Sequence, residues 1–242
     1  RSVRHVAENL NTFTWQLIPI NNETCQKDEE MEQFINHYRK ETDKKYDRIV
    51  TRFTNCLTHP VRNQETALGN LMADILCDSL GIDLMLMGSG AIRSYELGPV
   101  VHYQDLVECL PYDEAVYMLQ VNGTQLERML RRILREEAFE GEHTEFYQFS
   151  HGMQIIWSRG QQEFETLTLN GKALDQQKLY TIALSKFHYM NIQNFLNISL
   201  EEIKSNAPPR VLATSYRDIV EEYMMMNPHL SSEVEGRLIV KT

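Results

Sequence analysis

The sequence predicts an α+β fold in which helices pack on a mixed β-sheet. Strand-like and helix-like segments are mixed along the chain without the strict β-α-β alternation that a parallel α/β fold needs. Asn170-Gly171 is a hairpin turn signal that follows one of the strand-like segments. The chain has 242 residues, of which 42% are hydrophobic, so it is long and apolar enough to form a substantial core.

The composition argues against some classes of partner. The net charge is −10 and there is no basic stripe, so we expect no nucleic-acid partner. No apolar run has transmembrane length, so we expect no membrane partner. The four cysteines are far apart and form no Cys-x-x-Cys pair, which gives little support to a zinc site. Cys77 and Cys109 fall in apolar helical patterns and are predicted to be core thiols.

The N-terminal sequence and the thiols bear on location. The first ten residues, RSVRHVAENL, do not form a signal peptide and lack an initiator Met, so we expect a trimmed chain whose targeting signal is not visible. Eleven methionines and no disulfide framework favour a reducing compartment, so we expect a cytoplasmic protein.

The first 45 residues differ in pattern from the rest. Residues Thr12 to Ile20 (TFTWQLIPI) alternate and are rich in strand formers, which predicts a strand. The highly charged stretch that follows predicts an exposed helix ending near Thr42, with one apolar stripe. The stripe consists of Met31, Phe34, Ile35 and Tyr38. We expect a domain boundary near Tyr46.

From Tyr46 onward, strands and helices follow one another. We expect strands over 46–54, 82–87 and 115–121, and helices over 65–81 and 102–110. Gly81 is expected to terminate the first of these helices, and Pro111 the second.

The second half of this region continues the pattern. Asn122-Gly123 is predicted to be a turn, and Thr124 to cap a helix over 124–139. Strands are expected over 153–158, 166–169, 180–184 and 235–240, with a hairpin turn at Asn170-Gly171. A late helix is expected over 215–226.

The stretch LMGSGAIR, residues 86–93, places two glycines and an arginine at the end of a buried strand. Gly88 and Gly90 either allow positive φ or let another group approach the backbone closely. Successive backbone N–H groups in such a turn make an anion-binding concavity, to which Arg93 can add a bidentate fork. The alternative is a tight turn with a surface arginine.

Several separated motifs carry a family resemblance. They are Arg62, then ETALGNLMADIL, GSGAIRS, HYQDLVECLPY, VNGTQLERML and EGRLIV. In this order and spacing they resemble the C-terminal domain of the 5′-nucleotidase / UDP-sugar hydrolase family, over roughly residues 46–242. The segment WQLIPIN resembles the last strand of that family's N-terminal metallophosphatase domain. The resemblance implies a tail strand of that domain (1–21), a connector helix (22–45) and a substrate-binding domain (46–242).

The resemblance also implies a division of labour. In this family the N-terminal domain holds two divalent metal ions and hydrolyses the phosphate ester, while the C-terminal domain binds the nucleotide. This chain has no Asp-x-His and no Gly-Asn-His motif of the kind such metal sites use. We therefore expect no cofactor in this chain, no catalysis by it alone, and two partners: a nucleotide or nucleoside substrate and an N-terminal metallophosphatase domain.

Individual site residues follow from the resemblance. Arg62 and Arg93 match two arginines that the family directs at the substrate phosphate. Tyr112 matches a phenylalanine that stacks on one face of the base, and Phe187 matches the aromatic residue on the other face.

The glycine loop and a later loop complete the predicted site. Gly88, Ser89 and Gly90 are expected to contact the substrate, although Gly88 stands where many family members carry an Asn that binds the ribose, a bond that Ser89 can replace. The family's Gly-Gly-Asp-Gly loop is replaced by residues 190–194, MNIQN, in which Gln193 takes the aspartate's position. A Gln can form hydrogen bonds but is not an anionic acceptor, so the departure leaves the choice of base and sugar open.

Two further alternatives stay open at this stage. One is a non-catalytic nucleotide-binding module that partners a separate phosphatase. The other is a different substrate within the family, such as a UDP-sugar, a cyclic nucleotide or a non-nucleotide phosphate ester. A serine-hydrolase triad is not predicted, because Ser150-His151 and Ser185 have no acid–base partner at an informative spacing.

Overall fold

The computed structural model describes residues 15–140 and 144–242, and the chain divides into two units at Tyr46. In its described part, residues 15–45, the first unit contains one helix, α1 (Glu29–Tyr46), whose last residue is the first of the second unit. Asp28 Oδ1 accepts a hydrogen bond from the Met31 N–H at 3.0 Å and caps its start. The helix continues four residues past the predicted end at Thr42. Lys44 and Lys45 lie in its last turn, where their positive charges stabilise the negative end of the helix dipole.

The strand predicted over residues 12–20 is wrong for the part that the structure describes. Residues 15–20 have no regular secondary structure, and residues 12–14 lie outside the described ranges. Alternation predicts only which face of a strand is buried, and a strand also needs a neighbouring strand for its backbone hydrogen bonds.

The second unit is built on a central five-stranded sheet in the order β12-β6-β11-β3-β7. Only β11 and β3 run parallel, and the other pairs are antiparallel. The five strands are β3 (Leu84–Gly88), β6 (Val116–Asn122), β7 (Tyr147–Phe149), β11 (Leu179–Ser185) and β12 (Arg210–Ala213). β7 and β12 were not predicted, since three or four residues carry too little periodicity.

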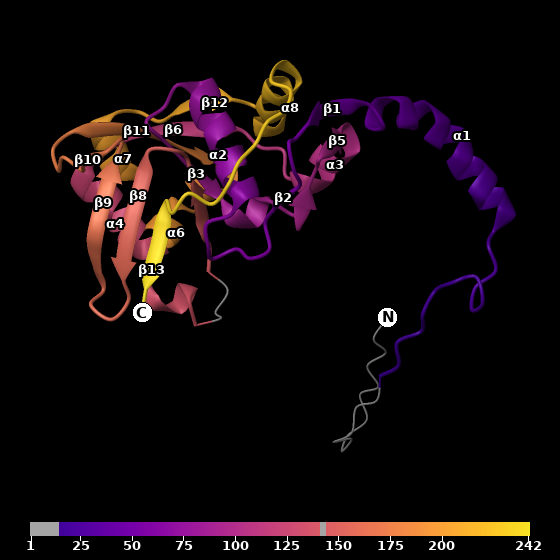
Figure 1. Cartoon of the computed structure of the whole chain (residues 1–242), viewed down its shortest axis with the longest axis horizontal. Coiled ribbons are helices and arrows are strands. Elements are labelled where there is room, and N and C mark those ends of the chain that lie inside the picture. Colours follow the sequence, from indigo (N-terminus) through magenta and orange to yellow (C-terminus); the bar gives the residue numbers. More distant parts are fainter. Residues whose placement is uncertain (1–14, 141–143) are drawn as a thin grey trace. The chain divides into compact units, whose positions relative to one another are not determined.

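A second sheet of four strands has the order β10-β9-β8-β13, seen side by side in Figure 1 except for short β10. Its strands are β8 (Met153–Ser158), β9 (Glu163–Leu169), β10 (Lys172–Ala173) and β13 (Leu238–Lys241), of which β13 runs parallel to β8. Asn170 and Gly171 have φ of 53° and 71°, which confirms the hairpin turn. Two small antiparallel pairs are β1 (Ile49–Arg52) with β5 (Val100–His102), and β2 (Leu57–Thr58) with β4 (Glu96–Leu97).

The helices of this unit cover both faces of the central sheet. They are α2 (Ala67–Leu80), α3 (Tyr103–Cys109), α4 (Gly123–Ile133), α5 (Lys186–Met190), α6 (Ile192–Leu196), α7 (Leu200–Asn206) and α8 (Tyr216–Met226), with 3₁₀ turns η1 (Ser89–Ala91) and η2 (Glu136–Ala138). Mixed sheets covered by helices confirm the predicted α+β fold. Within the described residues, no helix is both long and apolar enough to cross a membrane.

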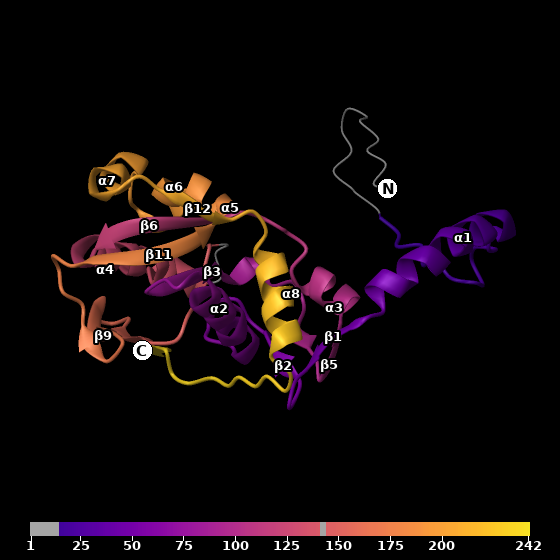
Figure 2. The same cartoon turned by 90° about the horizontal axis from the view of Figure 1, so that it is seen from above.

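The alternation of side chains along β3 explains why two cores form. Leu84 and Leu86 pack with α4 and the second sheet, whereas Met85 and Met87 pack with α2, α3 and α8. Figure 2 shows α2 and α8 side by side beyond β3. β3 is therefore buried on both faces, as its continuous apolar run predicts. Cys77 and Cys109 lie in the second core, which confirms that they are core thiols, and burial raises the pKa of Cys109 to about 12.

Two helix ends test the capping predictions. Gly81 has φ 61° and terminates α2, as predicted. The predicted turn at Asn122-Gly123 and cap at Thr124 are wrong. Asn122 is the N-cap of α4: its side chain accepts from the Gln125 N–H, and Gln125 Oε1 accepts from the Asn122 N–H, both at 2.9 Å. α4 also ends early, at Ile133, and η2 follows it.

Candidate functional site

The ends of four central strands meet at one edge of the sheet. β3 and β11 run parallel and finish there, at Gly88 and Ser185. β6 and β7 are antiparallel to their neighbours, so their starts lie at the same edge. This topology brings together segments that are far apart in sequence. The region just beyond the ends of such strands is a common ligand site.

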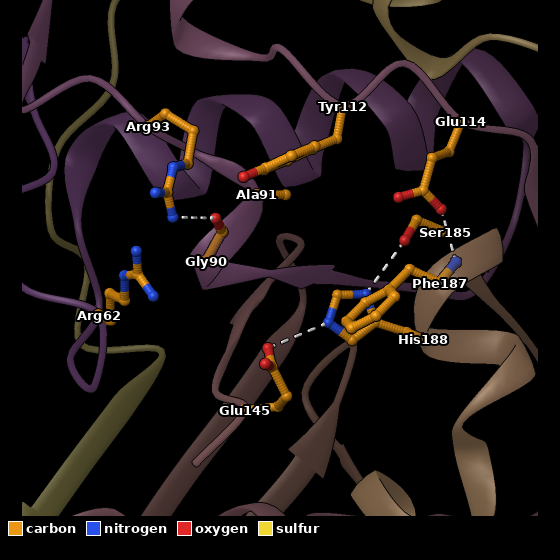
Figure 3. A pocket seen from close by; sticks show the side chains of 10 residues that line it. All are labelled: Arg62, Gly90, Ala91, Arg93, Tyr112, Glu114, Glu145, Ser185, Phe187 and His188. Carbon is orange, nitrogen blue, oxygen red and sulfur yellow. Dashed lines mark hydrogen bonds and ion pairs between the residues drawn. The ribbon is translucent and has the colours of Figure 1, made fainter. Parts of the chain in front are cut away.

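A pocket of about 510 Å³ lies at this edge (Figure 3). Five of the predicted site residues line it, together with five residues that were not predicted. The predicted ones are Arg62, Gly90, Arg93, Tyr112 and Phe187, and the others are Ala91, Glu114, Glu145, Ser185 and His188.

Backbone hydrogen bonds hold the loop after β3 in place. The Ser89 N–H donates to the Phe146 carbonyl at 2.8 Å, and the Arg93 N–H donates to the Cys109 carbonyl at 2.8 Å. Gly88 and Gly90 do not have positive φ, so conformational freedom is not why glycine stands there. Close approach is the reason at Gly88, where an added Cβ would lie 2.0 Å from His188 Cε1.

A buried polar network fixes the segment that carries Arg62. His59 is buried, its Nδ1 accepts from the Thr66 hydroxyl at 2.8 Å, and its Nε2 faces the Ser89 carbonyl at 3.1 Å. Burial lowers the pKa of His59, which favours the neutral imidazole, and in the neutral ring the carbonyl places the proton on Nε2 and leaves Nδ1 as the acceptor. Thr66 Oγ1 also accepts from the Gly69 N–H and so caps α2. The segment after β2 and the loop after β3 are thus tied to each other.

Ser89 belongs to this network and does not line the pocket. It is fully buried, and its hydroxyl accepts a hydrogen bond from Gln148 Nε2 at 3.0 Å. The structure therefore places Ser89 beneath the glycine loop, where it supports the loop.

One side of the pocket carries two cationic groups. Arg62 forms no hydrogen bond or ion pair with another residue in the described ranges. Arg93 Nη1 donates one long hydrogen bond of 3.4 Å to the Gly90 carbonyl, and its guanidinium lies 5.8 Å from the Tyr112 ring centroid. Figure 3 shows the two guanidinium groups near each other on the same side of the pocket. Guanidinium groups without carboxylate partners are suited to an anion.

Two exposed aromatic rings contribute apolar surface. Tyr112 and Phe187 are 50% and 47% exposed, so about half of each side chain is open to a ligand. The Phe187 and Phe195 rings pack together, with their centroids 5.6 Å apart. The Phe187 N–H donates to Glu114 Oε2 at 2.5 Å, and this hydrogen bond holds the start of α5. Such rings can stack on a flat ligand.

The acid–histidine–serine arrangement in the pocket was missed from sequence. Ser185 Oγ lies 3.0 Å from His188 Nδ1, and His188 Nε2 lies 3.4 Å from Glu145 Oε2. The expectation that Ser185 has no such partner is wrong: His188, three residues later, meets it because Ser185 is the N-cap of α5. The Ser-x-x-His spacing was the available signal, but Glu145 reaches His188 only through the pairing of β7 with β3.

This arrangement does not resemble a serine-hydrolase site in its surroundings. An oxyanion hole is usually built from free backbone N–H groups next to the nucleophile. Here the Lys186 N–H donates to the Ala115 carbonyl and the Phe187 N–H to Glu114. The other serine–histidine pair is also occupied elsewhere, since His151 Nε2 pairs with Asp78 at 2.6 Å and Ser150 accepts from the Met85 N–H.

Gln193 does not reach the pocket. It is exposed on α6, and the segment that replaces a glycine loop forms the end of α5 and the start of α6. Asn191 joins the two helices, since its N–H donates to the Phe187 carbonyl and its own carbonyl accepts from Phe195. Non-glycine residues here favour helix, which turns Gln193 outward.

The described residues do not fit a metal site. Across residues 15–140 and 144–242, no group of three or more His, Cys, Asp or Glu side chains could hold a metal ion.

A family model for the 5′-nucleotidase C-terminal domain matches residues 47–198, more than half of the chain. The chain belongs to this family. The match confirms the resemblance seen in the motifs, and the pocket residues all lie within the matched range. No curated protein matches the chain significantly.

Solved structures share the fold of this 5′-nucleotidase-family domain. A 5′-nucleotidase precursor from Thermus thermophilus aligns over 90% of this chain and 44% of its own, with a TM-score of 0.70 and 17% identity. An NAD nucleotidase from Haemophilus influenzae aligns over 89% and 42%, with a TM-score of 0.65 and 13% identity. A sulfate thiohydrolase, SoxB, from Thermus thermophilus aligns over 88% and 38%, with a TM-score of 0.66 and 13% identity.

These comparisons show the fold but do not fix a substrate. The chain spans less than half the length of each of the three structures, and their names describe different reactions. Substrate choice must therefore be argued from the pocket of this chain.

Proposed function

We propose that this domain binds the substrate of a 5′-nucleotidase-type metallophosphoesterase, which hydrolyses nucleoside phosphates to nucleoside and phosphate. The observation that carries the proposal is one pocket with two exposed aromatic rings and two guanidinium groups, neither of which pairs with a carboxylate among residues 15–140 and 144–242. A nucleotide presents the matching groups, an anionic phosphate and a flat base.

The five pocket residues that the sequence predicted have separate roles in this proposal. Arg62 and Arg93 hold the phosphate, and Gly90 lies beside both, since its carbonyl accepts from Arg93 Nη1 and an added Cβ would lie 3.5 Å from Arg62 Nη1. Tyr112 and Phe187 bind the base. Gly88, Ser89 and Gln193 have no direct contact with the ligand in this arrangement, because none of them lines the pocket.

The chemistry itself is proposed to come from a metallophosphatase domain with two divalent metal ions. Such a pair stabilises the attacking and leaving oxygens of a phosphate ester. The described residues of this chain do not fit a metal site, so its part is to bind and orient the substrate. A cytoplasmic location remains a proposal that rests on the free thiols.

Calorimetric titration tests the recognition role. The chain is titrated with AMP, adenosine, UDP-glucose and inorganic phosphate, and the titrations are repeated with Arg93→Ala and Tyr112→Ala. AMP is expected to bind saturably, with at least about fivefold weaker binding in each variant, since a charged hydrogen bond or a base stack contributes roughly 1–3 kcal/mol. Arg210→Ala, on exposed β12, is the matched control for charge. Equal AMP affinity in all four proteins would refute the assigned site.

A non-catalytic module that partners a separate phosphatase is the second candidate. The observation that favours it is the outward position of Gln193, which leaves the pocket without that side chain. Reading the genomic frame upstream of Arg1 separates the two, because a metallophosphatase in the same frame excludes the separate-chain form.

A further inference from the structure

Ser185, His188 and Glu145 form a hydrogen-bonded chain along one wall of the pocket (Figure 3). If His188 is neutral, the Ser185 hydroxyl donates to Nδ1 and the Nε2–H donates to Glu145 Oε2. Each group then donates to the next, from the Ser185 hydroxyl through His188 to the Glu145 carboxylate, which can only accept hydrogen bonds.

The imidazole at the middle of this chain has a single place to lie. Its side chain is only 3% exposed, and the Tyr147 ring packs against it with centroids 5.0 Å apart. An added Cβ at position 88 would lie 2.0 Å from His188 Cε1 and 2.6 Å from Nε2, so the ring occupies space that only glycine leaves open. His188 is thereby fixed with Nε2 directed at Glu145.

The carboxylate of Glu145 lies beside the cationic side of the pocket. A Cβ at Gly90 would lie 3.5 Å from Arg62 Nη1 and 3.8 Å from Glu145 Oε2, so a cation and an acceptor flank the same glycine. The Glu145 side chain is 20% exposed and lines the pocket. A ligand whose phosphate is held by Arg62 thus brings its neighbouring groups next to a carboxylate.

The other polar side chains near the rings are less suited to this role. Glu114 accepts the Phe187 N–H at 2.5 Å at the start of α5, and Figure 3 shows it across the pocket from Arg62, away from the phosphate position. Gln193 is exposed on α6 and does not line the pocket.

We propose that Glu145, oriented by His188 and Ser185, accepts a hydrogen bond from a hydroxyl or amino group of the ligand whose phosphate Arg62 and Arg93 bind. The inference rests on the proposed function and narrows its substrate class. The domain selects phosphate esters whose organic part carries a donor a few bonds from the phosphate, as the ribose hydroxyls of a ribonucleotide do. An ester with a flat ring but without such a donor cannot form this hydrogen bond and binds more weakly.

Calorimetry with AMP and 2′,3′-dideoxy-AMP tests the inference. The two ligands share the phosphate and the base, so the ratio of their affinities isolates the hydroxyl groups. The wild-type chain is expected to bind AMP at least about tenfold more tightly, the usual size of a hydrogen bond to a charged group. In Glu145→Gln, which keeps the shape and removes the charge, the ratio is expected to fall below about threefold.

Two further variants separate the local role from general effects. Glu108→Gln removes the same charge from the exposed surface of α3 and is expected to keep the wild-type ratio. His188→Ala removes the group that orients Glu145 and is expected to lower the ratio even where the variant remains folded by circular dichroism.

The outcomes are distinct from those of the functional proposal. If the chain binds AMP and Glu145→Gln keeps the wild-type ratio, Glu145 is not the acceptor and the proposed function still stands. If the wild-type chain binds neither nucleotide, the proposed function fails and this inference fails with it.

Discussion

The imidazole of His188 lies where a side chain at position 88 would have to go. Gly88 was assigned to the ligand site from sequence, yet in the structure its role is to leave room for His188. His188 in turn contacts Ser185 and Glu145, so one glycine supports the polar wall of the pocket. Two positions that are far apart in the chain are therefore coupled, which a double-mutant cycle can measure.

Gly88→Ala is expected to destabilise the fold by roughly 1–3 kcal/mol, because the added methyl group overlaps the buried His188 ring. The same substitution in a His188→Ala background is expected to cost much less, because the ring is gone. Urea unfolding of the four proteins gives both values. Gly160→Ala is the control, since an added Cβ there meets nothing within 4 Å. Equal costs of Gly88→Ala in the two backgrounds would contradict the coupling.

His59 gives a prediction for the pH dependence of stability. Burial lowers its folded-state pKa below the unfolded value of about 6.5. Below that pH the unfolded chain binds more protons, so the contribution of neutral His59 is complete above pH 6.5 and is lost as the pH falls towards the folded pKa. The stability difference between wild type and His59→Gln should therefore narrow from pH 7 to pH 5 in urea titrations. His229→Asn, at an exposed site whose φ of 64° Asn tolerates, is the control; a constant difference for His59→Gln would refute the assignment.

At the scale of elements, the start of α4 shows how one residue changes the limits of a helix. The pair Asn122-Gly123 is a common turn signal, but here Asn122 ends β6 and caps α4. Gly123 is required because an added Cβ would lie 2.3 Å from the Asp175 carbonyl oxygen. A contact from a distant segment thus decides between a hairpin turn and a helix start.

Asn122→Ala is expected to cost about 1 kcal/mol in the free energy of unfolding, because it removes the acceptor for the Gln125 N–H. Thr124→Ala is expected to cost clearly less, since Thr124 is not the cap and its hydroxyl bonds only to exposed Gln176. Both values come from chemical denaturation. A larger loss of unfolding free energy for Thr124→Ala than for Asn122→Ala would support Thr124 as the cap, as the sequence pattern predicts.

At the scale of the whole second unit, the end of the chain is fastened by a buried ion pair. Figure 1 shows the extended segment that leads from α8 to β13. Arg237 is 4% exposed, and both of its terminal nitrogens reach Asp74 of α2, at 2.6 and 2.7 Å. Its Nη1 also donates to the Phe149 carbonyl, so one guanidinium connects α2, β7 and the segment before β13.

Asp74→Asn is expected to destabilise the fold by roughly 3 kcal/mol, because it leaves a buried guanidinium with Glu235 as its one ionic partner among the described residues. The measurement is the midpoint and slope of urea unfolding. Asp78→Asn is the matched control on the same helix, since Asp78 pairs with the exposed His151 and its loss should cost less than about 1 kcal/mol. Similar losses in both variants would mean that the Arg237 pair has no special role.

The sequence alone determined the family, the fold class and part of the pocket. Local patterns were sufficient for three elements. A continuous apolar run predicted β3, an apolar face ending at Gly81 predicted α2, and Asn170-Gly171 predicted the hairpin turn. Each of these signals acts within a few residues. The ordered motifs also pointed to Arg62, Arg93, Tyr112 and Phe187, which the structure brings into one pocket.

Only the tertiary structure decided the rest. The strand β7 and the Ser185–His188–Glu145 chain depend on the pairing of strands that are distant in sequence, and no local pattern records that pairing. The same holds for the requirement for glycine at positions 88 and 123. There the His188 side chain and the Asp175 carbonyl, which come from distant segments, leave no space for a Cβ. The physical reason is that propensity and periodicity act over a few residues, whereas the chemistry of this pocket arises where four strand ends meet.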